Sequence, residues 1–551
     1  MSCESFVNDL RMESYHKTAL CYATAMKQDQ PTVARSTALM SVATLTSRVT
    51  GLARTFVMAA AVGTTYVTSA YQIANTMPNM IYELVLGGLL NAAFVPLYLL
   101  MMEKHGREGG NRYASNLLNI VILVMGALSI LATVFAPQVI ATQTMLTEQD
   151  AAVVTTAIFF FRIFAVQLLF YGISGVVTSM LNANRVFFLP SIAPAFNNIV
   201  VIASFVAYML LFAVDAQLAL ILLAVGTTLG VLVQLAIQIP AFVKLGFKWS
   251  PRIDFKDPGF IDTLKTGVPM VIYVVGMLAA FTFRHNFSLV NGDAGPATLF
   301  YAWMWFQLPH GVIAVSLSRA LFTEMSKSAA ADDMGAFRRF MQNGNTGTLL
   351  CMIPLAGLMC VLSTQIMQMF RMGAFTADDV ATVALVLSVW VLALPVYSFQ
   401  LHLFNVFASL RRFTTFSLIC TSFCALQCAL YAVLSSPELL GLVGICVADI
   451  VYYAVTVVVL LIVLRRYVGE VGVRGTLVSS LKALAATLLV VGLLWFLLPS
   501  LPYWAGPLGG FAMVVLYGAA GLAAILVLYK LLRIKETDLL FNAAKRFLKR
   551  S

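Results

Sequence analysis

Charged side chains are scarce in this sequence of 551 residues: they make up 11% of the chain, and hydrophobic residues make up 60%. Soluble domains carry about 25% charged residues. The composition therefore excludes an ordinary soluble protein and indicates a polytopic membrane protein with little sequence left for extra soluble domains. The net charge of +11 does not indicate nucleic-acid binding, because most basic residues flank apolar segments, as in membrane proteins.

Sequence motifs typical of enzymes and ATPases are missing as well. The sequence has no glycine-rich phosphate loop with lysine, no histidine–glutamate metal motif and no cluster of acidic residues at a membrane face. We therefore expect neither an enzyme nor an ATP-driven pump, and no cofactor. The eight cysteines offer no disulfide framework. Cys420, Cys424 and Cys428 share a helix face, which permits a soft-metal site, but small buried cysteines are the ordinary interpretation.

Long apolar runs are what the sequence does contain. About 20 apolar residues span a bilayer as a helix, and fourteen segments meet this length. We expect an all-α membrane protein with fourteen transmembrane helices. The predicted spans are 38–63, 70–101, 115–136, 153–181, 187–212, 217–243, 266–290, 297–322, 341–369, 379–409, 414–434, 439–464, 478–500 and 507–532.

The loops between these spans predict the orientation. Every second loop carries at least one lysine or arginine, whereas the intervening loops together carry one, Arg371. Because basic loops stay in the cytoplasm, we expect residues 1–35 and the basic tail 535–551 to be cytoplasmic. The longest inner loop, 244–265, alternates basic with bulky apolar residues, as in segments that lie on an anionic leaflet.

The inner loop 244–265 also divides twelve of the helices into two sets of six. We predict an N-lobe over 36–243, a C-lobe over 266–465 and two additional helices over 466–534. Aligning Pro78 of the second span with Pro309 of the eighth also matches two leucine pairs. Six helices return the chain to the same side, so the lobes would be parallel repeats about an axis along the membrane normal.

Two arginines lie in the middle of the first span. An arginine at mid-membrane costs from ~3 to above 10 kcal/mol, so Arg48 and Arg54 imply a polar cavity that holds an anion. They lie about 120° apart around the helix and ~9 Å apart along it, as expected for adjacent walls of one cavity. A guanidinium suits phosphate because it binds two oxygens at once. The alternative is a structural pairing, for which Glu83 is the nearest carboxylate.

Other polar and helix-breaking residues extend this candidate site. Arg284, in the seventh span, is a second-lobe cation that would complete the cavity or extend outward to the interface, and Asp449 is the acidic residue well inside the twelfth span. Helix-breaking residues suit spans that bend around a cavity. The predicted hinge positions are Pro78, Gly87, Gly88, Pro190, Pro194 and Pro309.

Three stretches of the chain resemble a known family. The first contains Ser47-Arg48-Val49-Thr50-Gly51-Leu52-Ala53-Arg54, then Met77-Pro78-Asn79 and Gly87-Gly88-Leu89. The second is Leu181-Asn182-Ala183-Asn184-Arg185, followed by Pro190 and Pro194. The third is Gln307-Leu308-Pro309-His310-Gly311. Together they resemble the MurJ/MviN family of lipid II flippases, over residues 36–534.

This resemblance implies a function and a site. Members move the undecaprenyl-diphosphate-linked peptidoglycan precursor, lipid II, to the outer leaflet of the bacterial cytoplasmic membrane. Two lobes enclose a cationic cavity, and the last two helices form a groove for the lipid tail. Arg48 and Arg54 match essential arginines that would bind the diphosphate, and Asn79 and Glu83 join the predicted substrate site. The implied partners are lipid II, membrane lipids and cell-wall synthases.

The chain also departs from the family pattern. It has Ser69 where many members have an acidic residue, Tyr82-Glu83 where they have an arginine, and Met304 where they have another arginine. We therefore predict that Arg284 supplies the second-lobe charge. Some members bind sodium, but the seventh span here lacks a carboxylate. Asp449 is then the candidate for ion coupling.

Alternative functions remain open at this level. The substrate of a flippase could be another undecaprenyl-diphosphate-linked glycan. A non-transporting scaffold for cell-wall synthesis would tolerate the loss of Arg48 and Arg54. A drug/cation antiporter is disfavoured because a cationic cavity repels cationic drugs, and a glycosyltransferase is disfavoured by the lack of catalytic acidic residues.

Overall fold

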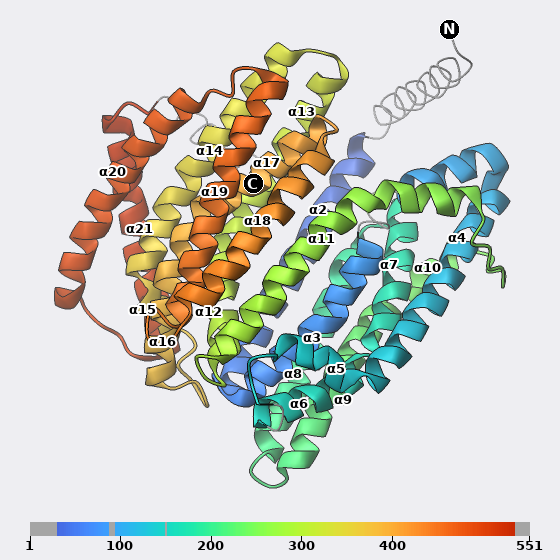
Figure 1. Cartoon of the computed structure of the whole chain (residues 1–551), viewed down its shortest axis with the longest axis horizontal. Coiled ribbons are helices and arrows are strands. Elements are labelled where there is room, and N and C mark those ends of the chain that lie inside the picture. Colours follow the sequence, from blue (N-terminus) through green and yellow to red (C-terminus); the bar gives the residue numbers. More distant parts are fainter. Residues whose placement is uncertain (1–29, 88–93, 149–150, 535–551) are drawn as a thin grey trace.

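The computed structural model describes residues 30–87, 94–148 and 151–534, and its regular elements in these ranges are all helical (Figure 1). We call the first bundle the N-lobe. Its elements are α2 (Gln30–Val62), α3 (Tyr66–Tyr82), η1 (Glu83–Gly87), α4 (Val95–Val134), α5 (Ala136–Gln143), α6 (Ala152–Phe164), α7 (Gln167–Ala183), α8 (Phe188–Leu211), α9 (Ala216–Ala236) and α10 (Ile239–Lys244).

The second bundle, the C-lobe, lies beside the first (Figure 1). Its elements are α11 (Pro258–Leu289), α12 (Gly295–Pro309), η3 (His310–Ala314), α13 (Val315–Ala330), α14 (Met334–Val361), α15 (Ser363–Gln368), α16 (Ala377–Trp390), η4 (Val391–Ala393), α17 (Leu394–Ser409), α18 (Phe413–Leu434) and α19 (Leu442–Val468). The chain then adds α20 (Val473–Leu497), η5 (Leu498–Ser500) and α21 (Gly506–Leu531), which pack on α14 and α15 of the C-lobe.

The described residues form helix within every predicted span. By length and apolarity, however, nine helices of the described ranges are able to cross a membrane, or ten if the bent pair α6 and α7 forms one span. Three of the four other predicted spans are interrupted or carry charges: α2 holds the two arginines, and α3 and α12 pass into π-helical turns. The all-helical membrane fold is confirmed, and the count of fourteen stays a prediction.

The helices break at some predicted positions and not at others. α3 continues through Pro78 and changes into the π-helical turn η1 at Glu83, and α12 changes into η3 directly after Pro309. A π-helical turn is a known site of kinks. α8, in contrast, runs unbroken through Pro194, and Pro190 lies in its first turn, where a proline removes no helical hydrogen bond. Gly88 lies outside the described residues.

Capping side chains and a glycine define several helix ends. Asp215 and Asp333 cap α9 and α14 by accepting hydrogen bonds from Leu218 N at 2.9 Å and Ala336 N at 2.8 Å. Such caps satisfy backbone donors that the first turn leaves open. Within α4, Gly106 adopts a φ of 62°, which separates the predicted second and third spans.

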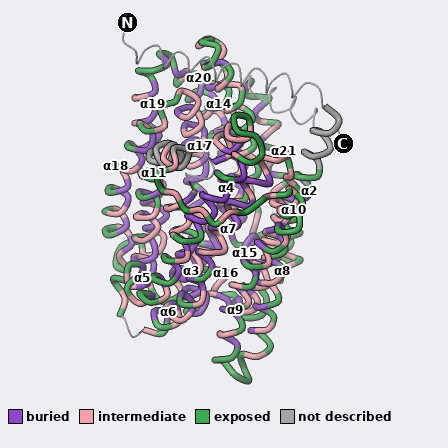
Figure 2. The backbone as a smooth tube through the Cα atoms, turned by 90° about the vertical axis from the view of Figure 1, so that its right-hand side faces the viewer, coloured by how far each residue is buried: buried purple, intermediate pink, exposed green. Residues whose placement is uncertain are grey.

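Burial follows the pattern of a membrane protein. Buried residues run through the interior along the length of the molecule, and exposed residues cover its outside (Figure 2). The exposed side chains of α20 and α21 are strongly apolar: Leu508 is 86% exposed and Trp495 is 71% exposed. Apolar surface of this kind belongs against lipid.

An extended strap connects the lobes. Residues 245–257 contain no helix, and α11 begins at Pro258, so the second half of the predicted linker 244–265 is helical. The Asn116 side chain of α4 donates to Asp254 O at 2.9 Å and accepts from Asp254 N at 2.7 Å. Asn119 donates to Ser250 O at 2.7 Å and to Arg252 O at 2.8 Å. The strap is therefore fastened to the N-lobe.

The strap also carries an ion pair outside the helices. Arg252 donates a hydrogen bond to Asp254 at 2.7 Å, which holds the pKa of that carboxyl below its usual value. Trp249 donates to Asn119 Oδ1 at 2.8 Å, and its ring is exposed. The alternation of exposed apolar residues and basic residues fits the interfacial segment predicted from the sequence, whose placement on a leaflet stays a prediction.

The two lobes meet at the end where the sequence places the outer loops. Ala374 N donates to Ala60 O at 2.8 Å, and Tyr301 donates to Gly63 O at 3.1 Å. Gly63 and Gly373 have φ values of 60° and 58°, and a Cβ on either would overlap a backbone carbonyl across the junction, that of Ala374 or Ala60. We call residues 60–63 and 373–374 the glycine clasp.

Replacing Gly373 with alanine is expected to loosen this closed end. The left-handed backbone costs a non-glycine residue roughly 1–2 kcal/mol, and the carbonyl of Ala60 leaves no room for the methyl group. The measurement is the rate at which a membrane-impermeant reagent modifies a Ser69→Cys side chain, in a chain otherwise free of cysteine. Ser69 is buried between the lobes, where it accepts from Ala297 N at 3.2 Å.

We expect the Gly373→Ala chain to react about tenfold faster than its parent, which corresponds to roughly 1.4 kcal/mol. Gly492→Ala is the matched control, because a Cβ at Gly492 meets nothing within 4 Å. Equal modification rates in the Gly373→Ala chain and its parent would show that the clasp does not hold this end closed.

Candidate substrate and coupling site

The first helix of the site, α2, is positioned by α8. Asn198 of α8 donates to Ser47 O and to Thr50 Oγ1, each at 3.2 Å. Gly51 lies on the same face, where a Cβ would be 3.4 Å from the Asn198 amide nitrogen. The polar and small residues around the two arginines therefore anchor α2 to the N-lobe and fix the direction of the arginine side chains.

Arg54 and Arg48 occupy different environments. Arg54 is half-buried and lies near Tyr71 on α3 and Tyr171 on α7. Arg48 is exposed, as expected for a residue about 120° further around the helix. Within the described ranges neither arginine forms an ion pair with a carboxylate. The structure therefore leaves both guanidinium groups without a countercharge.

Asn79 and Glu83 lie near the end of α3. Asn79 is exposed, and Glu83 is half-buried at the start of η1. The ring centre of the neighbouring Tyr82 lies 6.0 Å from that of Tyr171, one of the two tyrosines near Arg54. Among the described residues Glu83 has no ion-pair partner, so the alternative pairing of Glu83 with an α2 arginine is not formed in this structure.

Arg284 and Asp449, which the sequence singled out separately as a second-lobe cation and a candidate for ion coupling, form a buried ion pair. Arg284 Nη2 lies 2.9 Å from Asp449 Oδ2, and the two residues are 6% and 0% exposed. A guanidinium at this depth requires a partner, and α19 supplies the carboxylate. Arg284 is therefore not a free cation in this conformation, and an ion that binds Asp449 must compete with it. The predicted roles of both residues stay predictions.

Three further helices hold this pair. Asp449 accepts hydrogen bonds from Gln427 at 2.7 Å, from Trp390 at 2.9 Å and from Tyr431. Arg284 lies over the rings of Phe281, Trp303 and Trp390, with its guanidinium carbon 5.1–5.3 Å from their centres. Sequence reasoning missed these partners. The signal was present, however, because an arginine and an aspartate isolated in apolar helices of one lobe are expected to pair.

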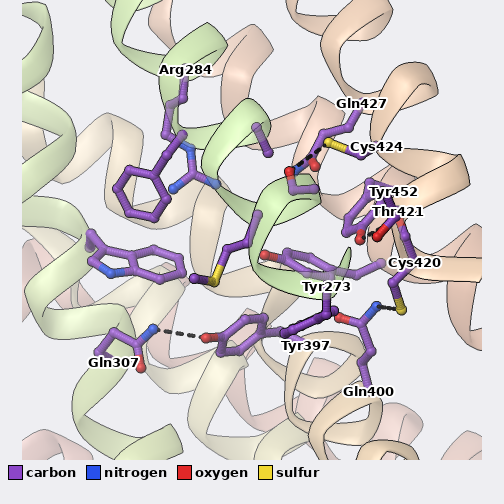
Figure 3. Close-up of a pocket in the computed structure, with 16 residues that line it drawn as sticks. Tyr273, Arg284, Gln307, Tyr397, Gln400, Cys420, Thr421, Cys424, Gln427 and Tyr452 are labelled. Carbon is purple, nitrogen blue, oxygen red and sulfur yellow. Dashed lines mark hydrogen bonds between the residues drawn. The ribbon is translucent and has the colours of Figure 1, made fainter. Parts of the chain in front are cut away.

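A cavity of about 290 Å³ lies next to the ion pair, inside the C-lobe. Figure 3 shows Arg284 at one side of it and the side chains of α11, α12, α17 and α18 around it. Gln307 donates to the Tyr397 hydroxyl at 3.0 Å, and Gln400 donates to Thr456 at 3.1 Å. Aromatic faces and amides dominate the lining, which suits polar groups that carry little charge.

The cysteine stripe of α18 borders the same cavity. Gln400 donates to Cys420 Sγ at 3.4 Å, and Cys424 donates to Gly276 O at 3.0 Å. No three metal-ligating side chains come together anywhere in the described ranges. Both thiols are thus engaged in hydrogen bonds with the protein.

The chain is similar to proteins of one family. The model of the family described as lipid II flippase MurJ matches residues 58–516. A Rhizobium meliloti protein described as a probable lipid II flippase MurJ is 28% identical over 363 residues, which are 64% of this chain and 66% of that protein. The lipid II flippase MurJ of Burkholderia cenocepacia is 24% identical over 352 residues, 63% of this chain and 67% of that protein. The matches thus span about two thirds of these relatives.

Solved structures show the same fold. A lipid II flippase MurJ in an inward-closed conformation matches with a TM-score of 0.74 at 21% identity, over 90% of this chain and 98% of that chain. An inward-facing multidrug resistance transporter of the MATE family matches with a TM-score of 0.64 at 15% identity, over 75% of this chain and 94% of that chain. With the family model covering most of its length, the chain belongs to the lipid II flippase MurJ family of multi-span membrane transporters.

Proposed function

We propose that this chain moves lipid II from the inner to the outer leaflet of the bacterial cytoplasmic membrane. The observation that carries the proposal is the pair of arginines on α2 that have no carboxylate partner in the described residues, in a chain of the lipid II flippase family. Unpaired cations within a membrane span are costly, and an anionic substrate offsets that cost. The diphosphate of lipid II is such an anion.

Arg48 and Arg54 bind the diphosphate in this scheme. Each guanidinium can donate two hydrogen bonds to phosphate oxygens, and the stronger interaction belongs to Arg54, because half-burial lowers the dielectric around it. Asn79 and Glu83 adjoin this environment and contact the headgroup. The sugar and peptide portions extend toward the C-lobe, where amides and aromatic rings line the cavity.

The transport cycle follows from the closed end. In this scheme the glycine clasp closes the end assigned to the outside while the headgroup enters from the cytoplasm. The lobes then rock, and the clasp opens. A membrane potential that is negative inside favours outward movement of an anion by ~2.3 kcal/mol per charge per 100 mV. Both termini are cytoplasmic in this scheme.

The lipid tail stays in the bilayer. α20 and α21 pack on the C-lobe with one face and expose apolar side chains on the other. This supports a groove for the undecaprenyl chain along these two helices, so that only the polar headgroup crosses the cavity.

The test is rescue of a strain depleted of its own lipid II flippase. We expect the parent chain to restore growth and to restore exposure of lipid II on the outer leaflet, measured directly with expression levels checked. A well-expressed chain that restores neither would contradict the proposal. Exposure of a different diphosphate-linked glycan would then assign that substrate, since the arginines recognise the shared diphosphate.

A further inference from the structure

A pocket of about 440 Å³ opens beside the glycine clasp, on the outer surface of the C-lobe. Its lining includes Arg371, which follows α15, and Tyr503 in the connection between α20 and α21; we call the end of the pocket at these two residues its mouth. With its amide oriented to satisfy its neighbours, Gln368 accepts from Gly506 N at 3.0 Å and from Arg371 Nη1 at 3.1 Å. Gln368 is buried, so it fixes the arginine at the mouth and joins α15 to the start of α21.

Below the mouth the pocket becomes an apolar groove. Ala377, Ala381, Ala384 and Leu385 line it on successive turns of α16, and Ser388 lies at its far end. From Ala377 to Ser388 the helix rises by ~16 Å. The small alanine side chains leave the groove open, and its length and polarity suit the first part of an acyl chain.

Aromatic side chains mark the depth of the mouth. Trp495 and Phe496 at the end of α20, Tyr503 and Trp504 in the connection and Phe511 in α21 are all exposed. Exposed tryptophan and tyrosine gather at the headgroup level of a bilayer. We therefore expect Arg371 and Tyr503 to lie at the headgroup level and the α16 groove to extend from there into the hydrocarbon.

We propose that this pocket binds one anionic glycerophospholipid of the outer leaflet. Its phosphodiester contacts Arg371 and Tyr503, and one acyl chain follows α16. Arg371 is the one charged side chain among the lining residues, all of which belong to the described ranges. One guanidinium balances the single charge of a phosphodiester, whereas a diphosphate would bring charge that no second cation balances.

The bound lipid stabilises the glycine clasp. Arg371 lies two residues before Gly373, and Ala374 is hydrogen-bonded to Ala60 of the N-lobe. A phospholipid that fixes Arg371 therefore stabilises the connection that closes the outer end. The site thereby gives the outer leaflet an influence on the conformational equilibrium.

The experiment measures lipid binding and needs no transport assay, so its result is independent of the proposed function. Purified protein is titrated with phosphatidylglycerol, and bound lipid is counted by native mass spectrometry. We expect one binding event that Arg371→Gln weakens about tenfold, as the loss of a charge-assisted hydrogen bond predicts, and that Arg371→Lys weakens less. Arg474→Gln, at an exposed arginine of α20, is the control and leaves binding unchanged.

A second pair of variants tests the groove. Ala381→Phe fills it and is expected to weaken binding, whereas Thr382→Phe, on the adjacent exposed position outside the lining, is not. Equal binding of phosphatidylglycerol and zwitterionic phosphatidylcholine would overturn the proposal, and so would Arg371→Gln without effect. Displacement of phosphatidylglycerol by an equimolar amount of undecaprenyl diphosphate, dependent on Arg371, would assign the pocket to the substrate instead.

Discussion

Replacing Arg54 with glutamine is expected to lower lipid II transport by at least about 100-fold, because two charge-assisted hydrogen bonds of about 1.5–3 kcal/mol each are lost. The half-buried position makes this the largest effect expected in the chain. Arg48→Gln should lower transport by about tenfold or more, a smaller loss, because the exposed guanidinium interacts with the diphosphate through a higher dielectric. The measurement is lipid II exposure on the outer leaflet, per molecule of expressed protein.

Two further variants separate charge from geometry. Arg54→Lys keeps the charge but loses the planar fork, so it should retain part of the activity. Arg474→Gln removes an exposed arginine of α20 and should transport like the parent. If Arg48→Gln and Arg54→Gln are expressed and transport normally, the arginines are structural and the diphosphate is bound elsewhere.

Removing one charge of the ion pair between Arg284 and Asp449 is expected to destabilise the protein by about 3–5 kcal/mol, because the remaining charge stays buried without its partner. Arg284→Met tests this, since methionine retains much of the packing volume among Phe281, Trp303 and Trp390. The measurement is unfolding of the purified protein in detergent.

The double variant Arg284→Met/Asp449→Asn is the decisive comparison. Removing both charges should recover most of the stability, because a buried pair contributes little net free energy relative to neutral residues. Transport that returns together with stability identifies Arg284 as a positioning residue. Stability without transport would instead support direct contact between Arg284 and the substrate. A double variant as unstable as Arg284→Met would contradict the pairing.

The sequence predicted those features that depend on local composition. Apolar runs located the helices, and the charge of Arg48 and Arg54 within an apolar segment was enough to single them out. Both predictions rest on the free energy of moving a residue from water into hydrocarbon, which depends on the residues of one segment and not on its contacts. The small and polar residues of α2 that pack on Asn198 belong to the same motif as the two arginines.

Features that depend on contacts between distant residues were not predicted. Arg284 and Asp449 are separated by 165 positions, and their pairing depends on how α11 and α19 pack. The glycine clasp joins Ala60 to Ala374, and neither segment carries a sequence pattern that indicates the other as its partner. The π-helical turn η1 runs from Glu83 to Gly87, which is one of the predicted hinge positions, whereas α3 continues through Pro78. Pro194 shows that a predicted hinge position need not interrupt a helix, because α8 continues through it.

The strap at residues 245–257 has a mechanical consequence. It fastens the beginning of α11 to α4 of the N-lobe, while the length of α11 packs on α18 of the C-lobe. At its far end α11 is tied to the N-lobe again, where Asn286 donates to Thr142 O at 2.9 Å. α11 is thus attached near both ends to the N-lobe and packed along its length against the C-lobe. When the lobes rotate relative to one another, α11 must bend or slide against one of them. The elastic resistance of one helix would then contribute to the rate at which the headgroup crosses.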